Sequence, residues 1–347
     1  MQQWYNRVIT GEAVGVIPAA LRWLLSAVSI VYGQIVHWRN IAYDRGWKCV
    51  TRLPVPVISV GNITTGGTGK TPTVIMIANC LTEAGLKPAI LTRGYGAKKG
   101  ERSDEVMVIE KECPGVPVVI NPDRIAGGKE AISRFQANVL ILDDGFQHRR
   151  LGRDLDIVLI DATSPLGVPG MFPRGAWREG PASLSRAHQI ILTRCEQVSD
   201  ELTDLAAGLL TQWVNPRRIY KQITEVVGVF DQNGGTVQGR GQTVLAFAGI
   251  ANPDGFVRTL SELGIQVSAG CWFDDHHRYV PVLDFPEMLK LTAERHPAAW
   301  VTTAKDWVKL RDFNPPVPLW HVRIAARITG VAGELWRQSL ADFANKK

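Results

Sequence analysis

The sequence predicts an α/β fold, in which helices cover both faces of a mostly parallel sheet. Three observations predict it. Short apolar runs alternate with helical patterns between residues 55 and 192. A glycine-rich loop follows the first run, and a later run, 139–142, ends in two adjacent acids. Alternation of this kind places a helix between parallel strands, and polar residues after such strands gather at one edge of the sheet.

The glycine-rich loop follows a strand predicted over residues 55–60. A loop of this composition that opens a helix with Gly-Lys-Thr is the phosphate-binding P-loop arrangement, although Thr64 stands where the pattern has its first glycine. Its backbone N–H groups converge on phosphate oxygens, the lysine reaches the β- and γ-phosphates, and the threonine hydroxyl binds Mg²⁺. A turn without a ligand is the alternative. The predicted nucleotide-binding residues are Thr64, Thr65, Gly66, Gly67, Thr68, Gly69, Lys70 and Thr71.

The elements after this loop continue the alternation and make the sheet P-loop NTPase-like. A helix is expected from Val74 to Ala84, because Gly85 provides a C-cap and Pro72 suits a first helical turn. A further helix begins near Arg124 and runs through Phe135. Strands are expected over 88–91, 116–120, 139–142, 156–160 and 189–192.

An acidic pair, Asp143 and Asp144, directly follows the strand at 139–142. An acid at the carboxyl end of a buried strand is where P-loop proteins hold their metal ion. The glycine-rich turn Arg93-Gly94-Tyr95 falls at the same edge. We therefore predict that the P-loop, the turn and the acids form one site, with Thr71, Asp143 and Asp144 holding the metal.

A second, smaller α/β domain is expected after the turn-rich residues 215–240. Strands over 243–247 and 265–268, a helix over 253–263 and a helix over 333–344 are predicted there. The cluster Phe273-Asp274-Asp275-His276-His277-Arg278-Tyr279 lies within it. The predicted divisions are 1–45, an N-terminal membrane-associated segment of the first domain, 46–222, the nucleotide-binding domain, and 223–347, the second domain with the C-terminal helix.

The N-terminal segment combines an apolar body with basic flanks. Residues 1–52 carry six Lys or Arg against two acids, and they hold four of the eleven tryptophans. Pro18 and Arg22 interrupt the apolar run, and the stretch from Trp23 to Gly33 is shorter than the roughly 20 residues that a spanning helix needs. This pattern favours a helix in the interface of an anionic membrane, with an amphipathic helix packed on the core as the alternative.

Composition excludes several classes. The 347 residues carry a net charge of +6, which fits a nucleotide, an anionic lipid or a nucleic acid. The five cysteines form no CxxC pair, so neither a zinc site nor a disulfide framework is indicated. The basic cluster accompanies the apolar N-terminus instead of interleaved exposed aromatics, which disfavours a nucleic-acid partner. No obligate protein partner is evident.

Several motifs together resemble the tetraacyldisaccharide 4′-kinase family, nearly end to end. They are Gly61 to Pro72, Arg93-Gly94-Tyr95-Gly96, Asp143-Asp144-Gly145-Phe146-Gln147-His148, Pro173 to Glu179, Phe273 to Tyr279 and Thr302 to Asp306. The resemblance implies two α/β domains with the site at their cleft, ATP and Mg²⁺ as cofactors, and a role in lipid A biosynthesis. The implied acceptor is the 4′-hydroxyl of a tetraacyldisaccharide 1-phosphate, which becomes lipid IVA. Monotopic attachment to the cytoplasmic face of the bacterial inner membrane is also implied.

The resemblance also assigns residues. Lys70 and Thr71 match the P-loop lysine and Mg²⁺ ligand, and Asp104 matches the catalytic aspartate. Its histidine partner is expected to be His276, with His277 as the alternative. Residues expected to line the cleft or contact substrate are Asn62, Arg93, Tyr95, Arg124, Gln147, His148, Arg178 and Glu179.

A membrane-associated regulatory ATPase or GTPase switch is the alternative function. Such switches carry a lysine just before the paired glycines, where this chain has Thr65. A guanine-specific Asn-Lys-x-Asp is absent, and Thr303-Ala304-Lys305-Asp306 is the nearest sequence. Both observations favour the kinase.

Overall fold

The computed structural model describes residues 2–94, 102–250, 252–275, 277–310 and 313–345. The chain divides into two compact units. Unit 1 comprises residues 1–94, 113–224 and 326–347, and unit 2 comprises 95–112 and 225–325. The expected domain limits differ from this division, because the segment at 95–112 groups with unit 2 and the C-terminal helix groups with unit 1.

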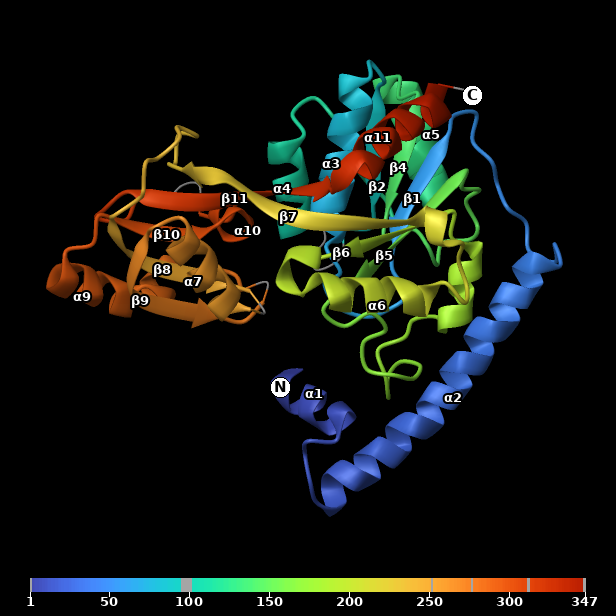
Figure 1. Ribbon diagram of the computed structural model, residues 1–347, viewed down its shortest axis with the longest axis horizontal. Coiled ribbons are helices and arrows are strands. Elements are labelled where there is room, and N and C mark those ends of the chain that lie inside the picture. Colours follow the sequence, from blue (N-terminus) through green and yellow to red (C-terminus); the bar gives the residue numbers. More distant parts are fainter. Residues whose placement is uncertain (1, 95–101, 251, 276, 311–312, 346–347) are drawn as a thin grey trace. The chain divides into compact units, whose positions relative to one another are not determined.

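Parallel strands form the centre of unit 1 (Figure 1). Its strands are β1 (Val57–Gly61), β2 (Pro88–Thr92), β3 (Val118–Ile120), β4 (Val139–Asp143), β5 (Leu155–Asp161) and β6 (Gln189–Thr193). The hydrogen-bonded order is β3-β2-β4-β1-β5-β6. Each strand of the central pair, β1 and β4, is buried along its whole length, as expected of parallel strands covered on both faces. The predicted α/β fold is confirmed.

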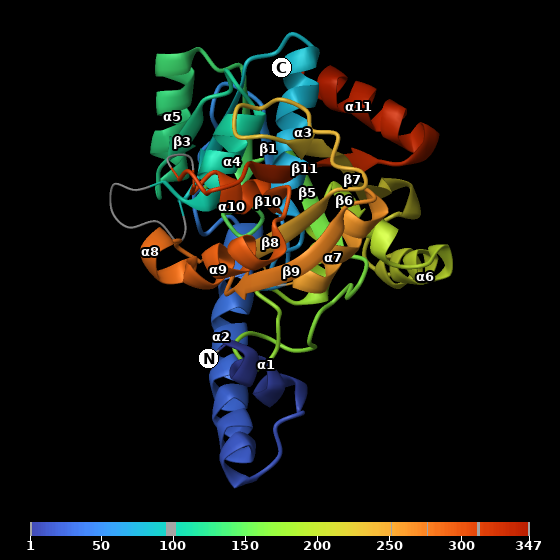
Figure 2. The ribbon, with the colours of Figure 1, turned by 90° about the vertical axis from the view of Figure 1, so that its left-hand side faces the viewer.

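Unit 1 also contains helices. They are α1 (Gln2–Thr10), α2 (Val16–Asp44), α3 (Lys70–Glu83), α5 (Arg124–Phe135), α6 (Asp200–Leu210) and α11 (Gly330–Asn345), with short 3-10 turns at Pro181–Arg186, Cys195–Gln197 and Pro216–Arg218. α3 begins four residues earlier than its apolar pattern predicts, at Lys70. α11 lies beside α3 in both views (Figure 2). Its Trp336 is 1% exposed and donates a hydrogen bond to Gln189. The core of unit 1 therefore includes this last helix.

Unit 2 is a smaller α/β unit. Its elements are α4 (Asp104–Glu112), β8 (Thr243–Gly249), α7 (Pro253–Glu262), β9 (Gln266–Phe273), α8 (Pro281–Asp284), α9 (Pro286–Arg295), β10 (Ala299–Thr303) and α10 (Ala304–Trp307). The strands β10, β8 and β9 are parallel neighbours. Two further strands, β7 (Ile219–Phe230) and β11 (Leu319–Ile328), have residues in both units and complete the 11-stranded order. Phe247, Phe285 and Trp300 form the aromatic centre of the core of unit 2.

The N-terminal segment forms one short and one long helix. Pro18 lies in the first turn of α2 and Arg22 donates to the carbonyl of Ala13, so neither interrupts the 29-residue helix. By length and composition α2 is apolar enough to cross a membrane, with a mean hydropathy of 1.6 over its best window and only 6% of that window buried. The expectation that Pro18 and Arg22 shorten the apolar segment is thus wrong. An exposed apolar helix near the N-terminus favours membrane association.

Candidate active site

The P-loop joins β1 to α3 and is fixed on two sides. Thr65 N donates to Ala176 O at 2.6 Å, and Thr193 Oγ1 donates to Thr68 O at 3.0 Å. Gly69 caps α3 with φ of +79°, in the left-handed region that glycine adopts without strain. The loop therefore presents the N-terminus of a 14-residue helix toward a ligand, which favours an anion there.

Lys70, the first residue of α3, turns toward two neighbouring strands. Its Nζ lies 3.5 Å from Asn62 Oδ1 and 3.7 Å from Asp144 Oδ1. β1 and β4 are parallel neighbours with Val60 opposite Asp143, so their carboxyl ends lie side by side. The structure thus brings together the P-loop and the acidic pair that the sequence places in one site.

The two acids of the pair differ in their surroundings. Asp143 Oδ2 accepts a hydrogen bond from Thr92 Oγ1 at 3.2 Å, and its carbonyl accepts from Arg124 Nη2 at 3.0 Å. Asp144 Oδ2 lies 2.7 Å from Arg178 Nη1. Burial raises the pKa of Asp144, but the positive charges of Lys70 and Arg178 together outweigh it and lower the pKa overall. Asp144 is therefore an ionised group between two cations at neutral pH.

Buried polar atoms test whether the site suits a nucleotide and a metal ion. Ser59 Oγ, Asn62 Nδ2 and Thr68 Oγ1 are buried without a hydrogen-bond partner. Buried polar atoms normally have partners, so three such atoms beside a P-loop fit a polar ligand. Within the described ranges no three His, Cys, Asp or Glu side chains cluster as a protein-only metal site would require. Mg²⁺ binds through one or two carboxylates together with substrate phosphates and water, and the carboxylates of Asp143 and Asp144 lie at the edge of the sheet that the P-loop occupies.

His148 is an uncharged side chain among several arginines of the site. Its Nδ1 lies 3.4 Å from Arg93 Nη2. Burial, with help from Arg93, Arg124 and Arg153, lowers the pKa of His148 to about 4. Gln147 beside it donates to Asn62 O at 2.8 Å and so supports the end of β1. His148 is therefore neutral at pH 7, and the positive charge around it comes from the arginines.

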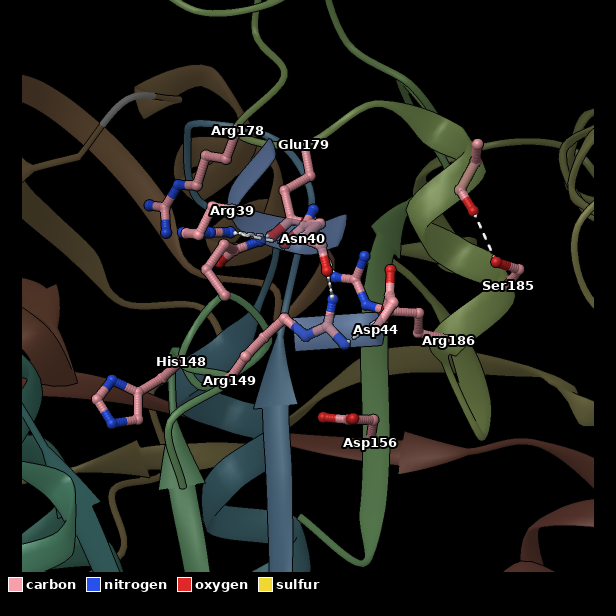
Figure 3. Close-up of polar contacts among 12 residues, drawn as sticks. Arg39, Asn40, Asp44, His148, Arg149, Asp156, Arg178, Glu179, Ser185 and Arg186 are labelled. Carbon is pink, nitrogen blue, oxygen red and sulfur yellow. Dashed lines mark hydrogen bonds and ion pairs between the residues drawn. The ribbon is translucent and has the colours of Figure 1, made fainter. Parts of the chain in front are cut away.

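Glu179 is a buried acid, 1% exposed, on the loop that also carries Arg178. Its carboxylate accepts hydrogen bonds from Arg39 Nη2 at 2.7 Å, Asn40 Nδ2 at 3.0 Å and Arg186 Nη2 at 2.6 Å (Figure 3). Two of these partners belong to α2. Since Arg178 precedes Glu179 and pairs with Asp144, adjacent residues of one loop contact α2 and the acidic pair.

The remaining predicted residues concern unit 2. Tyr95 and His276 lie outside the described residues. Asp104 is the first residue of α4, and its Oδ2 lies 2.8 Å from Lys309 Nζ. His277 stacks on Phe273 with ring centroids 4.7 Å apart, and its Nε2 lies 3.1 Å from Asp284 Oδ2, without hydrogen-bond geometry. Sequence reasoning missed Lys309. The only signal was its position three residues after Asp306, which suits an ion pair on one turn.

Comparison with known proteins gives consistent matches over most of the chain. The family model described as "LpxK: Tetraacyldisaccharide-1-P 4'-kinase" matches residues 21–341. A tetraacyldisaccharide 4′-kinase of Syntrophus aciditrophicus is 38% identical over 315 residues, covering 83% of this chain and 84% of the relative. One from an Anaeromyxobacter species is 36% identical over 352 residues, covering 95% and 92%.

A solved structure matches as well. The "apo" form of LpxK from Aquifex aeolicus in complex with ATP superposes with a TM-score of 0.76 at 29% sequence identity. The match covers 93% of this chain and 99% of that one.

Proposed function

This chain belongs to the tetraacyldisaccharide-1-P 4′-kinase family, and from that membership we infer that it transfers the γ-phosphoryl group of ATP to the 4′-hydroxyl of a tetraacyldisaccharide 1-phosphate in lipid A biosynthesis. The observation that carries the inference is the family match over residues 21–341 in a chain whose P-loop lysine faces an acidic pair. The matches do not favour the regulatory switch.

The chemistry assigned to unit 1 is binding and charge neutralisation. We propose that the P-loop holds the phosphates of ATP, that Lys70 contacts the β- and γ-phosphates, and that Arg124 adds positive charge. Thr71, Asp143 and Asp144 would hold Mg²⁺, which neutralises phosphate charge when bound. Phosphoryl transfer passes through a loose transition state, so positioning and charge neutralisation account for most of the catalysis.

The chemistry assigned to Asp104 and a histidine is proton removal. The oxygen of the 4′-hydroxyl forms the new bond to the γ-phosphorus, the bond from that phosphorus to the β,γ-bridging oxygen breaks, and ADP leaves. The hydroxyl proton passes to the histidine, and Asp104 stabilises the imidazolium. His276 is the proposed base, because the ring of His277 is already stacked on Phe273 and faces Asp284.

The cellular setting is part of the same proposal. The exposed apolar side chains of α2 include Trp23, Leu24 and Ile35, each more than 60% exposed. A helix of this kind with basic flanks suits the interface of an anionic membrane. We propose monotopic attachment at the cytoplasmic face of the inner membrane, where both ATP and a membrane-held acceptor are accessible.

The test is transfer of label from γ-labelled ATP to tetraacyldisaccharide 1-phosphate in detergent micelles. The unchanged chain should label the lipid, and Lys70→Ala should abolish labelling because ATP loses its phosphate contact. Lys290→Ala removes an exposed lysine of unit 2, whose side chain is 77% exposed, and should label at the wild-type rate. Hydrolysis of ATP without lipid labelling would refute the kinase assignment.

A further inference from the structure

A buried lysine in unit 2 has three acceptors. Lys309 follows α10, and its side chain is 8% exposed. Its Nζ lies 2.8 Å from Asp104 Oδ2 and 3.4 Å from Asp306 Oδ1, and it donates to the backbone carbonyl of His277 at 3.0 Å. An ammonium group has three N–H donors, so these three acceptors match its full capacity.

We propose that Lys309 is a positioning residue for phosphoryl transfer, which fixes the Asp104 carboxylate and the backbone at His277 relative to each other. The inference rests on the proposed function, in which Asp104 and a histidine of this loop remove the hydroxyl proton. Lys309 contacts neither ATP nor lipid in this proposal. It acts through Asp104 and through the chain segment that carries the histidine.

Lys309 can fix the positions of other groups because its own position is fixed by its contact with Asp306. Asp306, which is 0% exposed, accepts hydrogen bonds from Gly249 N at 3.1 Å and Thr303 Oγ1 at 2.8 Å. Gly249 ends β8 and Thr303 ends β10. Asp306 is thus fixed by two strands of the core of unit 2, and Lys309 transmits that fixed position to α4 and to the loop at His277.

The surroundings make the contacts of Lys309 strong. The ring of Tyr279 lies 5.6 Å from Lys309 Nζ and shields it on one side. Exposed ion pairs contribute little to stability, whereas removal of one partner from a buried pair leaves an uncompensated charge. Loss of Lys309 would leave Asp104 and Asp306 facing a gap with two negative charges. We expect Asp104 to reorient as a result.

The charges of the cluster also suit the reaction. Lys309 brings one positive charge to Asp104 and Asp306, so the three groups have one negative charge in excess. An imidazolium that forms when a histidine accepts the hydroxyl proton would be stabilised by that excess. Lys309 therefore reduces the repulsion between the two carboxylates. The one negative charge that remains is available to stabilise the imidazolium.

The experiment uses the full chain and a double-mutant cycle of Lys309→Met and Asp104→Asn. Steady-state kinetics in lipid micelles give kcat and the KM for ATP. A positioned base is worth about 10²–10⁴-fold, so Lys309→Met should lower kcat by about 10²-fold, within that limit, and leave the KM for ATP within about twofold. Because Lys309 acts through Asp104, the double variant should be no slower than Asp104→Asn alone. Lys290→Met, an exposed charge removal in unit 2, should match the wild type.

Three outcomes would overturn the inference. A wild-type kcat for Lys309→Met would do so, and so would a double variant that loses the product of the two single losses, since that would indicate an independent structural role. If Lys309→Met does not fold, Lys309→Gln gives a polar but shorter and neutral side chain with only two N–H donors for the three acceptors, and a wild-type kcat for that variant would equally refute the proposal. If the unchanged chain does not label the lipid, the proposed function itself fails. If it does label the lipid and one of the outcomes above is found, only the positioning role of Lys309 fails, so the two failures can be told apart.

Discussion

Glu179→Gln should loosen the attachment of α2 to the rest of unit 1. The carboxylate accepts three hydrogen bonds, two from arginines and one from Asn40, and it is 1% exposed. Hydrogen bonds to charged groups contribute about 1 kcal/mol more than neutral ones, so a neutral amide should forfeit about 3 kcal/mol over three bonds. That value agrees with the roughly 3–5 kcal/mol lost when a buried ion pair is broken.

Hydrogen exchange is the suitable assay, because a chain with two units does not unfold in one step. A loss of about 3 kcal/mol corresponds to a fall of about 10²-fold in the protection of amides in residues 34–44. Asp44→Asn is the matched control at the same junction. Asp44 pairs with Arg149 at 2.6 Å, but its side chain is 57% exposed, so the expected loss is below about 1 kcal/mol.

The reasoning would be refuted if Glu179→Gln and Asp44→Asn reduced protection equally. It would also be refuted if protection fell for Glu179→Gln by less than about tenfold. Either result would mean that burial and charge at Glu179 do not hold α2, and that its exposed apolar face or other contacts do.

Three further predictions concern packing, acid stability and membrane binding. Gly61→Ala would place a Cβ 2.7 Å from Phe146 Cβ, so it should lower the melting temperature by an amount equivalent to about 1–3 kcal/mol, whereas Gly208→Ala in α6 has open space and should not. His148 is uncharged when folded with a pKa of about 4 and binds a proton near pH 6.5 when unfolded, so stability rises with pH across that window. In denaturant midpoints measured from pH 7 to 4, His148→Gln should lose less stability than the wild type. Replacing Trp23 and Leu24 of α2 by serine should weaken binding to anionic liposomes by about 10²-fold, and Leu205→Ser on α6, a side chain 69% exposed, should leave flotation unchanged.

The sequence could predict those parts of the site whose residues are neighbours along the chain. The P-loop is predictable because its glycines, lysine and threonine are consecutive and their backbone requirements are local. The acidic pair is predictable because charged residues end a buried apolar run, and Asp143 and Asp144 directly follow the run at 139–142. The parallel register then places both at one edge. No contact between distant residues had to be known for this part of the site.

Contacts between distant residues explain what the sequence could not predict. Glu179 contacts Arg39, which is 140 residues away in the sequence. The residues next to Glu179 in the sequence do not indicate that a helix near the N-terminus covers it. Lys309 meets Asp104 in the same way, from another element of unit 2. The apolar pattern alone starts α3 at Val74, and only the P-loop motif places Lys70 and Thr71 in the first turn of the helix, where the structure has them. Their helical conformation follows from the P-loop geometry and not from an apolar pattern.

The order of the units along the chain has a consequence for biosynthesis. Unit 2 consists of two inserted segments, and unit 1 resumes after the second with α11, whose Trp336 is buried and contacts Gln189. Domains generally fold during synthesis as their residues emerge from the ribosome. The nucleotide-binding unit starts first but cannot close its core until α11 has been made. A chain that ends after unit 2 would therefore have its P-loop present while the side of α3 that contacts α11 is uncovered, which makes it a species suited to recognition by chaperones.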